Sequence, residues 1–210
     1  MQSAIRTYSK DQSLVSSRRA HIARCAARVL ASKGHDRATV RDIGKACGMG
    51  AGTLYHYVGS KSDIVYLVVE YGMIEVSKGW RKVFSEGDSI IAAEVVRRAI
   101  RAHIEAVDSH QDIVFVLYRE IARLDSRSRR LILEIEMELA AEYEKVLTRG
   151  CDAGEFSIQD IAMTAHNILV VAHMWAIRRW FFRGHCTLEE YITRQTEMIL
   201  KTISAEFSKE

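Results

Sequence analysis

The chain has 210 residues, 12 glycines and no proline, a composition that favours helices and excludes collagen-like and proline-rich disordered classes. Hydrophobic residues at 48% and charged residues at 27% allow a buried core and argue against intrinsic disorder. The net charge is +3, but residues 1–62 hold 11 Lys and Arg against 3 Asp and Glu, and residues 63–210 hold 19 against 24. A basic head on an acidic body favours polyanion binding by the head, with a solvated basic helix as the plainer alternative.

Three helices are predicted in the basic segment, after a loose arm over residues 1–15. Apolar residues at helical spacing and their end signals place these helices over residues 17–32, 40–47 and 53–58. Gly34 ends the first helix, and Thr39 with Asp42 forms a capping-box pattern at the start of the second. A glycine-rich turn joins the second helix to the third, so residues 1–62 are predicted to form one head domain.

The rest of the chain, residues 63–210, is predicted to form a second, helical domain. Ser60 and Asp63 form another capping box, which begins a long apolar helix that ends near Phe84. Five more helices follow, over residues 89–109 and 111–124, after Asp125, from the Ser157/Asp160 cap to 184, and from the Thr187/Glu190 cap to 207. Strand-like alternation is absent from the sequence, so the predicted fold is all-α with about nine helices.

Two short helices around a tight turn are the pattern of a helix-turn-helix. The second helix of such a motif is short and polar outside, because it enters a DNA major groove about 12 Å wide. Hydroxyl and imidazole groups on its predicted outer face suit phosphates and base edges, and they belong to Thr53, Tyr55, His56 and Tyr57. Arg41 can hold a guanine with two hydrogen bonds, and Lys61 lies where a helix dipole favours phosphate. The alternative is an ordinary helical hairpin with surface aromatics.

Residues 39–48, 52–58 and 60–61 resemble the DNA-binding head of the TetR family of bacterial repressors, and the resemblance covers about residues 17–70. It implies a homodimer that binds a palindromic operator and releases it when a small ligand enters the C-terminal domain. It also implies that Arg41 and Thr53 read or flank bases, and that Thr39 caps its helix and contacts the DNA backbone. The remaining backbone contacts would come from Tyr55, His56, Tyr57 and Lys61.

Three positions depart from the pattern of the family. Gly50 stands where a serine often caps the recognition helix, Gly44 replaces a usual alanine, and Val58 replaces a usual phenylalanine. A lost helix cap weakens a helix by roughly 0.5–2 kcal/mol. These departures leave the family resemblance intact.

The C-terminal domain is marked by a stretch of aromatic residues and arginines over residues 175–184. Trp175 and Arg179 are four residues apart, so on one helix the guanidinium can stack on the indole. The stretch is similar to TetR-type regulators that sense CoA thioesters, whose phosphates need cations and whose acyl group needs an apolar slot. The cations would be Arg178, Arg179 and Arg183, and the slot would include Phe115, Tyr118 and Trp175. Alternatively, the aromatics form a dimer core and the arginines its rim.

No enzyme, cofactor or metal site is expected. His166 and His173 are seven residues apart, about 10.5 Å along a helix, and are interpreted as polar members of a buried interface. The four cysteines form no C-x-x-C pair and residues 1–19 lack a secretory apolar core, which favours a reduced cytoplasmic protein. Residues 161–177 are too short and polar for a membrane span. Together with the last helix, they are expected to pair with the same two helices of a second subunit in a two-fold four-helix interface. A helical enzyme or carrier and a helical adaptor are the rival functional classes.

Overall fold

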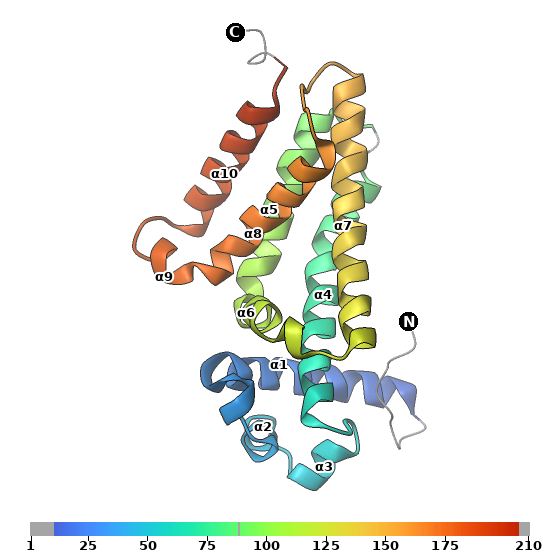
Figure 1. The fold of residues 1–210 in the computed structure, drawn as a ribbon, viewed down its shortest axis with the longest axis vertical. Coiled ribbons are helices and arrows are strands. Elements are labelled where there is room, and N and C mark those ends of the chain that lie inside the picture. The colour runs from blue at the N-terminus through green and yellow to red at the C-terminus, as the bar shows by residue number, and fades with distance from the viewer. Residues whose placement is uncertain (1–10, 88, 206–210) are drawn as a thin grey trace. The chain divides into compact units, whose positions relative to one another are not determined.

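The computed structural model describes residues 11–87 and 89–205, and within these ranges the fold is helical, with a single isolated β-bridge between Phe156 and Ser204. Ten α-helices and one 3-10 helix are present in the described residues (Figure 1). The chain divides into two compact units. Unit 1 holds the residues up to Ile74 together with Asp112–Leu133, and unit 2 holds Glu75–Gln111 and the residues from Glu134 onward. The predicted all-α fold is confirmed.

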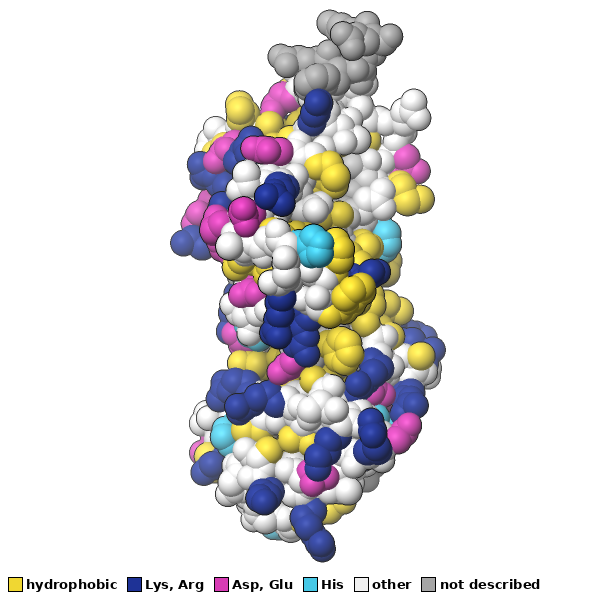
Figure 2. Space-filling view, turned by 90° about the vertical axis from the view of Figure 1, so that its left-hand side faces the viewer, with side chains coloured by type: hydrophobic (Ala, Val, Ile, Leu, Met, Phe, Trp, Pro, Cys, Tyr) yellow, Lys and Arg dark blue, Asp and Glu magenta, His cyan; other side chains and the backbone are white. Residues whose placement is uncertain are grey.

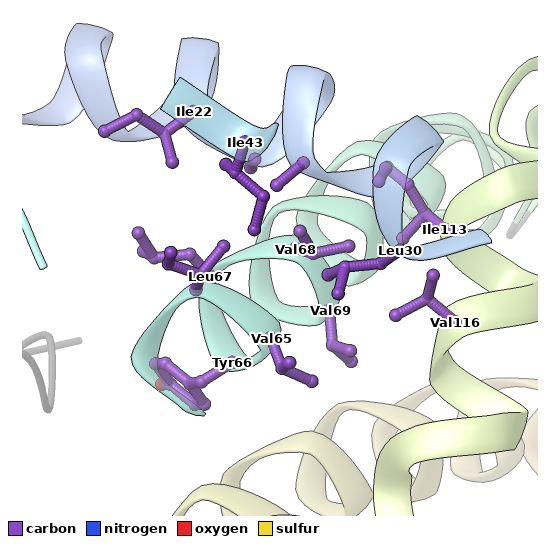
Figure 3. Close-up of a cluster of buried hydrophobic side chains, with 14 of the residues drawn as sticks. Ile22, Leu30, Ile43, Val65, Tyr66, Leu67, Val68, Val69, Ile113 and Val116 are labelled. Carbon is purple, nitrogen blue, oxygen red and sulfur yellow. The ribbon is translucent and has the colours of Figure 1, made fainter. Parts of the chain in front are cut away.

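Unit 1 is built from the predicted head and from a segment of the middle of the chain. Its elements are α1 (Gln12–Arg37), α2 (Val40–Ala46), α3 (Ala51–Tyr55), the first part of α4 (Lys61–Ser85), most of α6 (Gln111–Glu120), the 3-10 helix η1 (Ile121–Arg123) and the start of α7 (Ser126–Asp152). Figure 3 shows how Ile22 and Leu30 of α1 and Ile43 of α2 lie over α4, whose residues 65–69 form the middle of the core. Ile113 and Val116 of α6 belong to the same buried cluster, so α6 packs with the head.

The first helix is longer than the sequence predicts. It begins at Gln12, because the Asp11 carboxylate caps it by accepting hydrogen bonds from the backbone N–H groups of Ser13 and Leu14. Residues 12–15 are therefore helical, where a loose arm is predicted, and residues 1–10 lie outside the described part of the chain. The predicted end at Gly34 is confirmed as a break, since Gly34 has a φ of 79° and leaves the helical conformation.

The second and third helices form the predicted helix-turn-helix. The capping box of Thr39 and Asp42 is present at the start of α2, and Gly48 has a φ of 65° in the turn. The third helix covers residues 51–55 and not 53–58, because Gly50 already caps it and the chain turns at His56. The turn carries Val58 to full burial, and Leu54 is also fully buried, so both predicted inner residues lie in the core.

Replacing Gly48 with alanine is expected to destabilise unit 1 by about 1–2 kcal/mol, because a Cβ at a positive φ meets its own backbone. Gly52→Ala is the matched control, since Gly52 lies within α3, has no positive φ and has no atom within 4 Å of its Cβ position. Urea unfolding followed by circular dichroism compares the two variants. Equal unfolding midpoints for them would contradict the assigned turn geometry.

Unit 2 holds the remainder of α4 and α7, together with α5 (Ala92–Ser109), α8 (Ile161–Ile177), α9 (Arg179–Phe182) and α10 (Leu188–Ile203). Helix α5 packs against both α8 and α10 and buries a stripe of apolar residues. The predicted Thr187/Glu190 capping box is present at the start of α10. No helix in the described residues is long and apolar enough to cross a membrane.

Several predicted helix ends in this part of the chain are wrong. Helix α5 begins at Ala92 and not at Ser89, because the Glu155 carboxylate accepts hydrogen bonds from the N–H groups of Ala92 and Ala93, each at 3.0 Å. The predicted helix 111–124 ends as α6 at Glu120 and continues as the 3-10 helix η1.

The predicted single helix that ends near residue 184 is two helices. Asp160 alone caps α8, by accepting a hydrogen bond from the N–H of Met163. The chain leaves the helical conformation at Arg178, with φ −103° and ψ 23°, and then forms the short helix α9. This break accounts for ten α-helices in the described residues where nine are predicted. Helix α10 ends at Ile203, and the predicted end at residue 207 lies outside the described residues.

Candidate DNA-binding and ligand-binding sites

The N-terminus of α2 is fixed by hydrogen bonds on both sides of the capping box. The Thr39 hydroxyl accepts from the N–H of Asp42 at 3.1 Å, and the Asp42 carboxylate accepts from the N–H of Thr39 at 3.0 Å. Lys33 of α1 lies 2.8 Å from the same carboxylate. Hydrogen bonds from Lys33 and Thr39 hold the pKa of Asp42 well below its usual range. The start of α2 is thereby tied to α1, although Thr39 itself remains exposed.

The turn of the motif lies directly on the backbone of α2. The N–H of Met49 donates to the carbonyl oxygen of Gly44 at 2.8 Å, and a Cβ on Gly44 would lie 2.8 Å from the carbonyl oxygen of Met49. Such an approach leaves no room for a side chain without a shift of the turn. Glycine in place of the usual alanine at position 44 therefore allows the turn to pack directly against the backbone of α2.

Two polar residues of α1 hold the motif from behind, and sequence reasoning missed both. Arg19 is only 9% exposed, and its Nε donates to the carbonyl oxygen of Tyr57 at 3.2 Å. Burial lowers the pKa of Arg19, and the carboxylates of Glu70 and Asp63 oppose this effect. The ring Nε2 of His21 donates to the carbonyl oxygen of Cys47 at 3.0 Å. One signal in the sequence could have indicated the burial of Arg19. Arg19 stands four residues after Val15, so the two side chains share the apolar face of α1.

All seven predicted DNA-contact residues belong to unit 1. Five of them, Thr39, Arg41, Thr53, Tyr55 and His56, are exposed, and Tyr55 shows 46% of its surface. Tyr57 and Lys61 are half-buried, and Tyr57 packs partly on the core of the head, so it is less of an outer-face residue than predicted. Figure 2 shows Lys and Arg side chains spread over the lower part of the view, which holds α1–α3.

A buried carboxylate joins α6 to the end of α1 within unit 1. Glu120 is 2% exposed, and its Oε1 accepts from the N–H of His35 at 3.3 Å and from Arg119 Nε at 2.9 Å. The Arg119 guanidinium also donates to the carbonyl oxygens of Leu30 and Ala31, close to the helix break at Gly34. We call Arg119 and Glu120 the α1–α6 clamp. It fixes the C-terminal end of α1 to α6.

The predicted ligand residues are divided between the two units. Phe115 and Tyr118 lie in unit 1, where Phe115 carries the Arg119 guanidinium 5.2 Å above its ring. Trp175 lies in unit 2, where it is 8% exposed and its Nε1 donates to Asp108 at 2.6 Å. Its indole stacks near two further rings, with centroid distances of 5.8 Å to Phe182 and 5.0 Å to Tyr191. Trp175 is thus part of a buried aromatic cluster.

The three predicted ligand arginines lie at and beyond the end of α8. Arg178 and Arg183 are exposed, Arg179 is half-buried, and the Arg178 guanidinium lies 4.9 Å above the Trp180 ring. Because the helix breaks at Arg178, Trp175 and Arg179 are not on one continuous helix, as their predicted stacking assumes. Trp180 remains 69% exposed and Phe181 41% exposed, so this end of unit 2 presents aromatic surface beside positive charge.

The two histidines of α8 occupy different environments. His173 is buried within the chain, whereas His166 is exposed in the single chain, so its place in a buried interface stays a prediction. The His173 ring meets the ring of His103 on α5 edge to face, at 5.1 Å and 86°. Burial lowers the pKa of His173 to about 4 and also lowers that of His103. No group of three or more potential metal ligands occurs among the described residues.

Comparison with known proteins gives a family for both parts of the chain. The family model "Bacterial regulatory proteins, tetR family" matches residues 22–66, and "Tetracyclin repressor-like, C-terminal domain" matches residues 91–203. The transcriptional regulator HbdR of Aromatoleum sp. (strain CIB) is 26% identical over 192 residues, which cover 90% of this chain and 82% of that protein. The transcriptional repressor KstR2 of Rhodococcus jostii is 27% identical over 188 residues, which cover 88% and 90%.

Solved structures share the fold. The ketosteroid transcriptional regulator KstR2 of Mycobacterium tuberculosis has a TM-score of 0.75 at 22% identity, covering 97% of this chain and 99% of that one. AibR in complex with isovaleryl coenzyme A and operator DNA has a TM-score of 0.76 at 22% identity, covering 86% and 97%. The family models and the named relatives confirm the prediction of a DNA-binding transcriptional regulator. From its helix-turn-helix to the end of α10, the chain belongs to the tetR family of bacterial regulatory proteins.

Proposed function

We propose that the protein is a cytoplasmic repressor that binds a palindromic operator as a homodimer and is released by a small effector. The observation that carries this proposal is the exposed row of Arg41, Thr53, Tyr55 and His56 on a helix-turn-helix that α1 fixes from behind. Such a row supplies a guanidinium, hydroxyls and an imidazole to one groove. In functional terms, residues 1–62 act as the DNA-binding domain and residues 63–210 as the ligand and dimerisation domain.

Each DNA-contact residue has a role that follows from its position. Arg41 is in the first turn of α2, is exposed and makes no ion pair with another described residue, so its guanidinium is available for a base. Thr53 and Tyr55 lie on α3, which enters the major groove. Lys61 is the first residue of α4, where charge and helix dipole together favour a phosphate. Thr39, His56 and Tyr57 contact the DNA backbone.

Arg41→Ala is expected to relax sequence preference at one base pair in each half-site, at a cost of about 1–3 kcal/mol on the operator. Lys61→Ala is its matched comparison, since it removes a phosphate contact and weakens binding to all sequences alike. Fluorescence anisotropy with operator and scrambled DNA at several salt concentrations measures both effects, and Lys61→Ala also lowers the salt dependence. An Arg41→Ala protein that keeps the full operator preference would contradict the role assigned to Arg41.

We infer that the effector is a CoA thioester. Arg178, Arg179 and Arg183 gather within six residues at the end of α8, in a segment of the chain that is otherwise net acidic. An anionic, partly apolar ligand accounts for cations beside aromatic rings, whereas a neutral apolar drug needs no arginine. The fold neighbour AibR, solved with isovaleryl coenzyme A and operator DNA, supports this class of ligand. Trp175, which lies in the same unit as these arginines, is proposed to contribute to the acyl slot.

An acyl-CoA is expected to release the operator, and the matching free acid to do so weakly or not at all. Arg179→Ala is expected to keep wild-type operator affinity but to require about tenfold more acyl-CoA for release, because it removes a phosphate partner and leaves the head unchanged. Arg97→Ala is the control, since Arg97 is an exposed arginine of α5 that pairs with Glu94. Titration of the protein–operator complex with a panel of acyl-CoAs and free acids measures the response. If no thioester releases the DNA, the effector class is wrong while the repressor assignment stands.

A further inference from the structure

A fully buried histidine in unit 2 has no hydrogen-bond partner among the described residues. His103 of α5 has no exposed surface, and neither of its ring nitrogens is hydrogen-bonded to another described residue. A neutral imidazole carries one donor and one acceptor, and leaving both unmet in a core destabilises the folded chain. Native proteins keep few such groups, and those they keep need an explanation.

The residues around His103 indicate which kind of ligand could hydrogen-bond to its ring. Its neighbours on the buried face of α5 are the apolar side chains of Ile100, Ile104 and Val107, and the ring of His173 meets it from α8. Burial lowers the pKa of both imidazoles, so both are neutral at pH 7. An anion placed there would lose its hydration without gaining a charge partner, whereas a neutral oxygen would gain a hydrogen bond at small cost.

We propose that the His103 imidazole donates a hydrogen bond to the carbonyl oxygen of the effector's acyl thioester. This assignment rests on the proposed function, and it adds the group that recognises the acyl end. A thioester carbonyl is a neutral acceptor joined to an apolar chain, which matches a neutral imidazole donor among apolar side chains. The phosphates of the same molecule are remote from that carbonyl and suit the arginines that begin at Arg178. His173, which contacts His103, precedes Arg178 by five residues, about 7.5 Å along the axis of α8.

The variant His103→Leu separates a ligand-binding role from a structural one. Leucine fills most of the same volume without an unmet polar group, so the ligand-free full-length variant is expected to melt a few degrees above wild type. The same variant is expected to need about tenfold more acyl-CoA to release the operator. A histidine kept for packing or for a buried water would give a lower melting temperature, and that result would overturn the proposal.

The carbonyl itself is tested with two coenzyme A derivatives of equal chain length. One is an acyl-CoA, such as octanoyl-CoA, and the other is the corresponding S-alkyl-CoA thioether, which lacks the carbonyl oxygen. Wild type is expected to respond about tenfold more strongly to the thioester, and His103→Leu is expected to lose that preference. Thr196→Val is the matched control, because Thr196 of α10 is also buried and its hydroxyl also lacks a partner among the described residues. It is expected to keep the thioester preference.

Three further results would overturn the assignment, and they can be told apart. If wild type responds equally to thioester and thioether, His103 does not read the carbonyl, although the CoA effector class stands. If Thr196→Val loses the preference as His103→Leu does, the effect comes from general stability and not from a contact. If wild type responds to no coenzyme A derivative of several chain lengths, the effector class falls and the role of His103 falls with it.

Discussion

Val170→Asp is expected to convert a dimer into a folded monomer and to lower operator affinity by more than about a thousandfold. Helix α8 carries no Asp, Glu, Lys or Arg over its 17 residues, yet part of it faces outward. Val170 is half-buried in the single chain, and Met163 is 57% exposed on the same helix. Met198 of α10 adds a second outward apolar side chain, 52% exposed. A two-fold interface through these helices would bury all of them.

The expected size of the effect follows from the symmetry of the interface. An unpaired carboxylate costs several kcal/mol when it is buried, and a two-fold dimer carries the substitution twice. Operator binding falls as well, because two heads must reach half-sites about 34 Å apart at once. Sedimentation velocity at micromolar concentration measures assembly, and anisotropy measures DNA binding. Ala141→Asp is the control, since Ala141 is exposed on α7 and gains the same charge. A Val170→Asp protein that stays dimeric would contradict the interface.

Glu120→Ala is expected to lower the free energy of unfolding of unit 1 by about 3 kcal/mol. The substitution leaves the N–H of His35 without its acceptor and removes the carboxylate that orients the Arg119 guanidinium. Arg119 in turn supplies hydrogen bonds to the carbonyl oxygens of Leu30 and Ala31, so loss of the clamp loosens the end of α1. Urea unfolding followed by circular dichroism measures the change.

Two further variants distinguish the effect of the α1–α6 clamp on stability from the effect of exposed ion pairs. Glu120→Gln keeps an acceptor for the N–H of His35 but loses the charge beside Arg119, so an intermediate loss is expected. Arg123→Ala removes the ion pair with Asp36, in which both side chains are more than half exposed, and a longer contact of 3.7 Å with Glu120. A much smaller loss than that of Glu120→Ala is therefore expected. Equal unfolding midpoints for Glu120→Ala and wild type would contradict the role of the clamp.

The features that could be predicted from the sequence are those whose partners are close along the chain. The capping boxes of Thr39 with Asp42 and of Thr187 with Glu190 each join residues three apart, so the pattern alone places the start of the helix. The same holds for Asp125, whose carboxylate accepts from the N–H of Ser128 at 3.0 Å. The capping box of α2 and the glycine turn at Gly48 together predict the helix-turn-helix and its family.

The features that could not be predicted depend on partners far along the chain. Helix α5 begins where Glu155 caps it from more than sixty residues away, and Arg119 reaches the carbonyl oxygen of Leu30 across 89 positions. Trp175 is placed by Asp108, 67 positions before it, and not by the neighbouring Arg179 as the spacing suggests. No periodicity in the sequence indicates which distant side chain lies opposite. The ligand-binding residues are therefore harder to predict than the DNA-binding ones.

The central claim is that this chain is a sequence-specific operator-binding regulator. The direct test is an electrophoretic mobility shift of the full-length protein with the DNA upstream of its own gene, beside a scrambled duplex of equal length and composition. At one moderate salt concentration, we expect retardation of the upstream DNA at a protein concentration at least a hundredfold below that needed for the scrambled duplex. Equal retardation of the two duplexes would contradict the claim, because basic charge alone would then explain the binding.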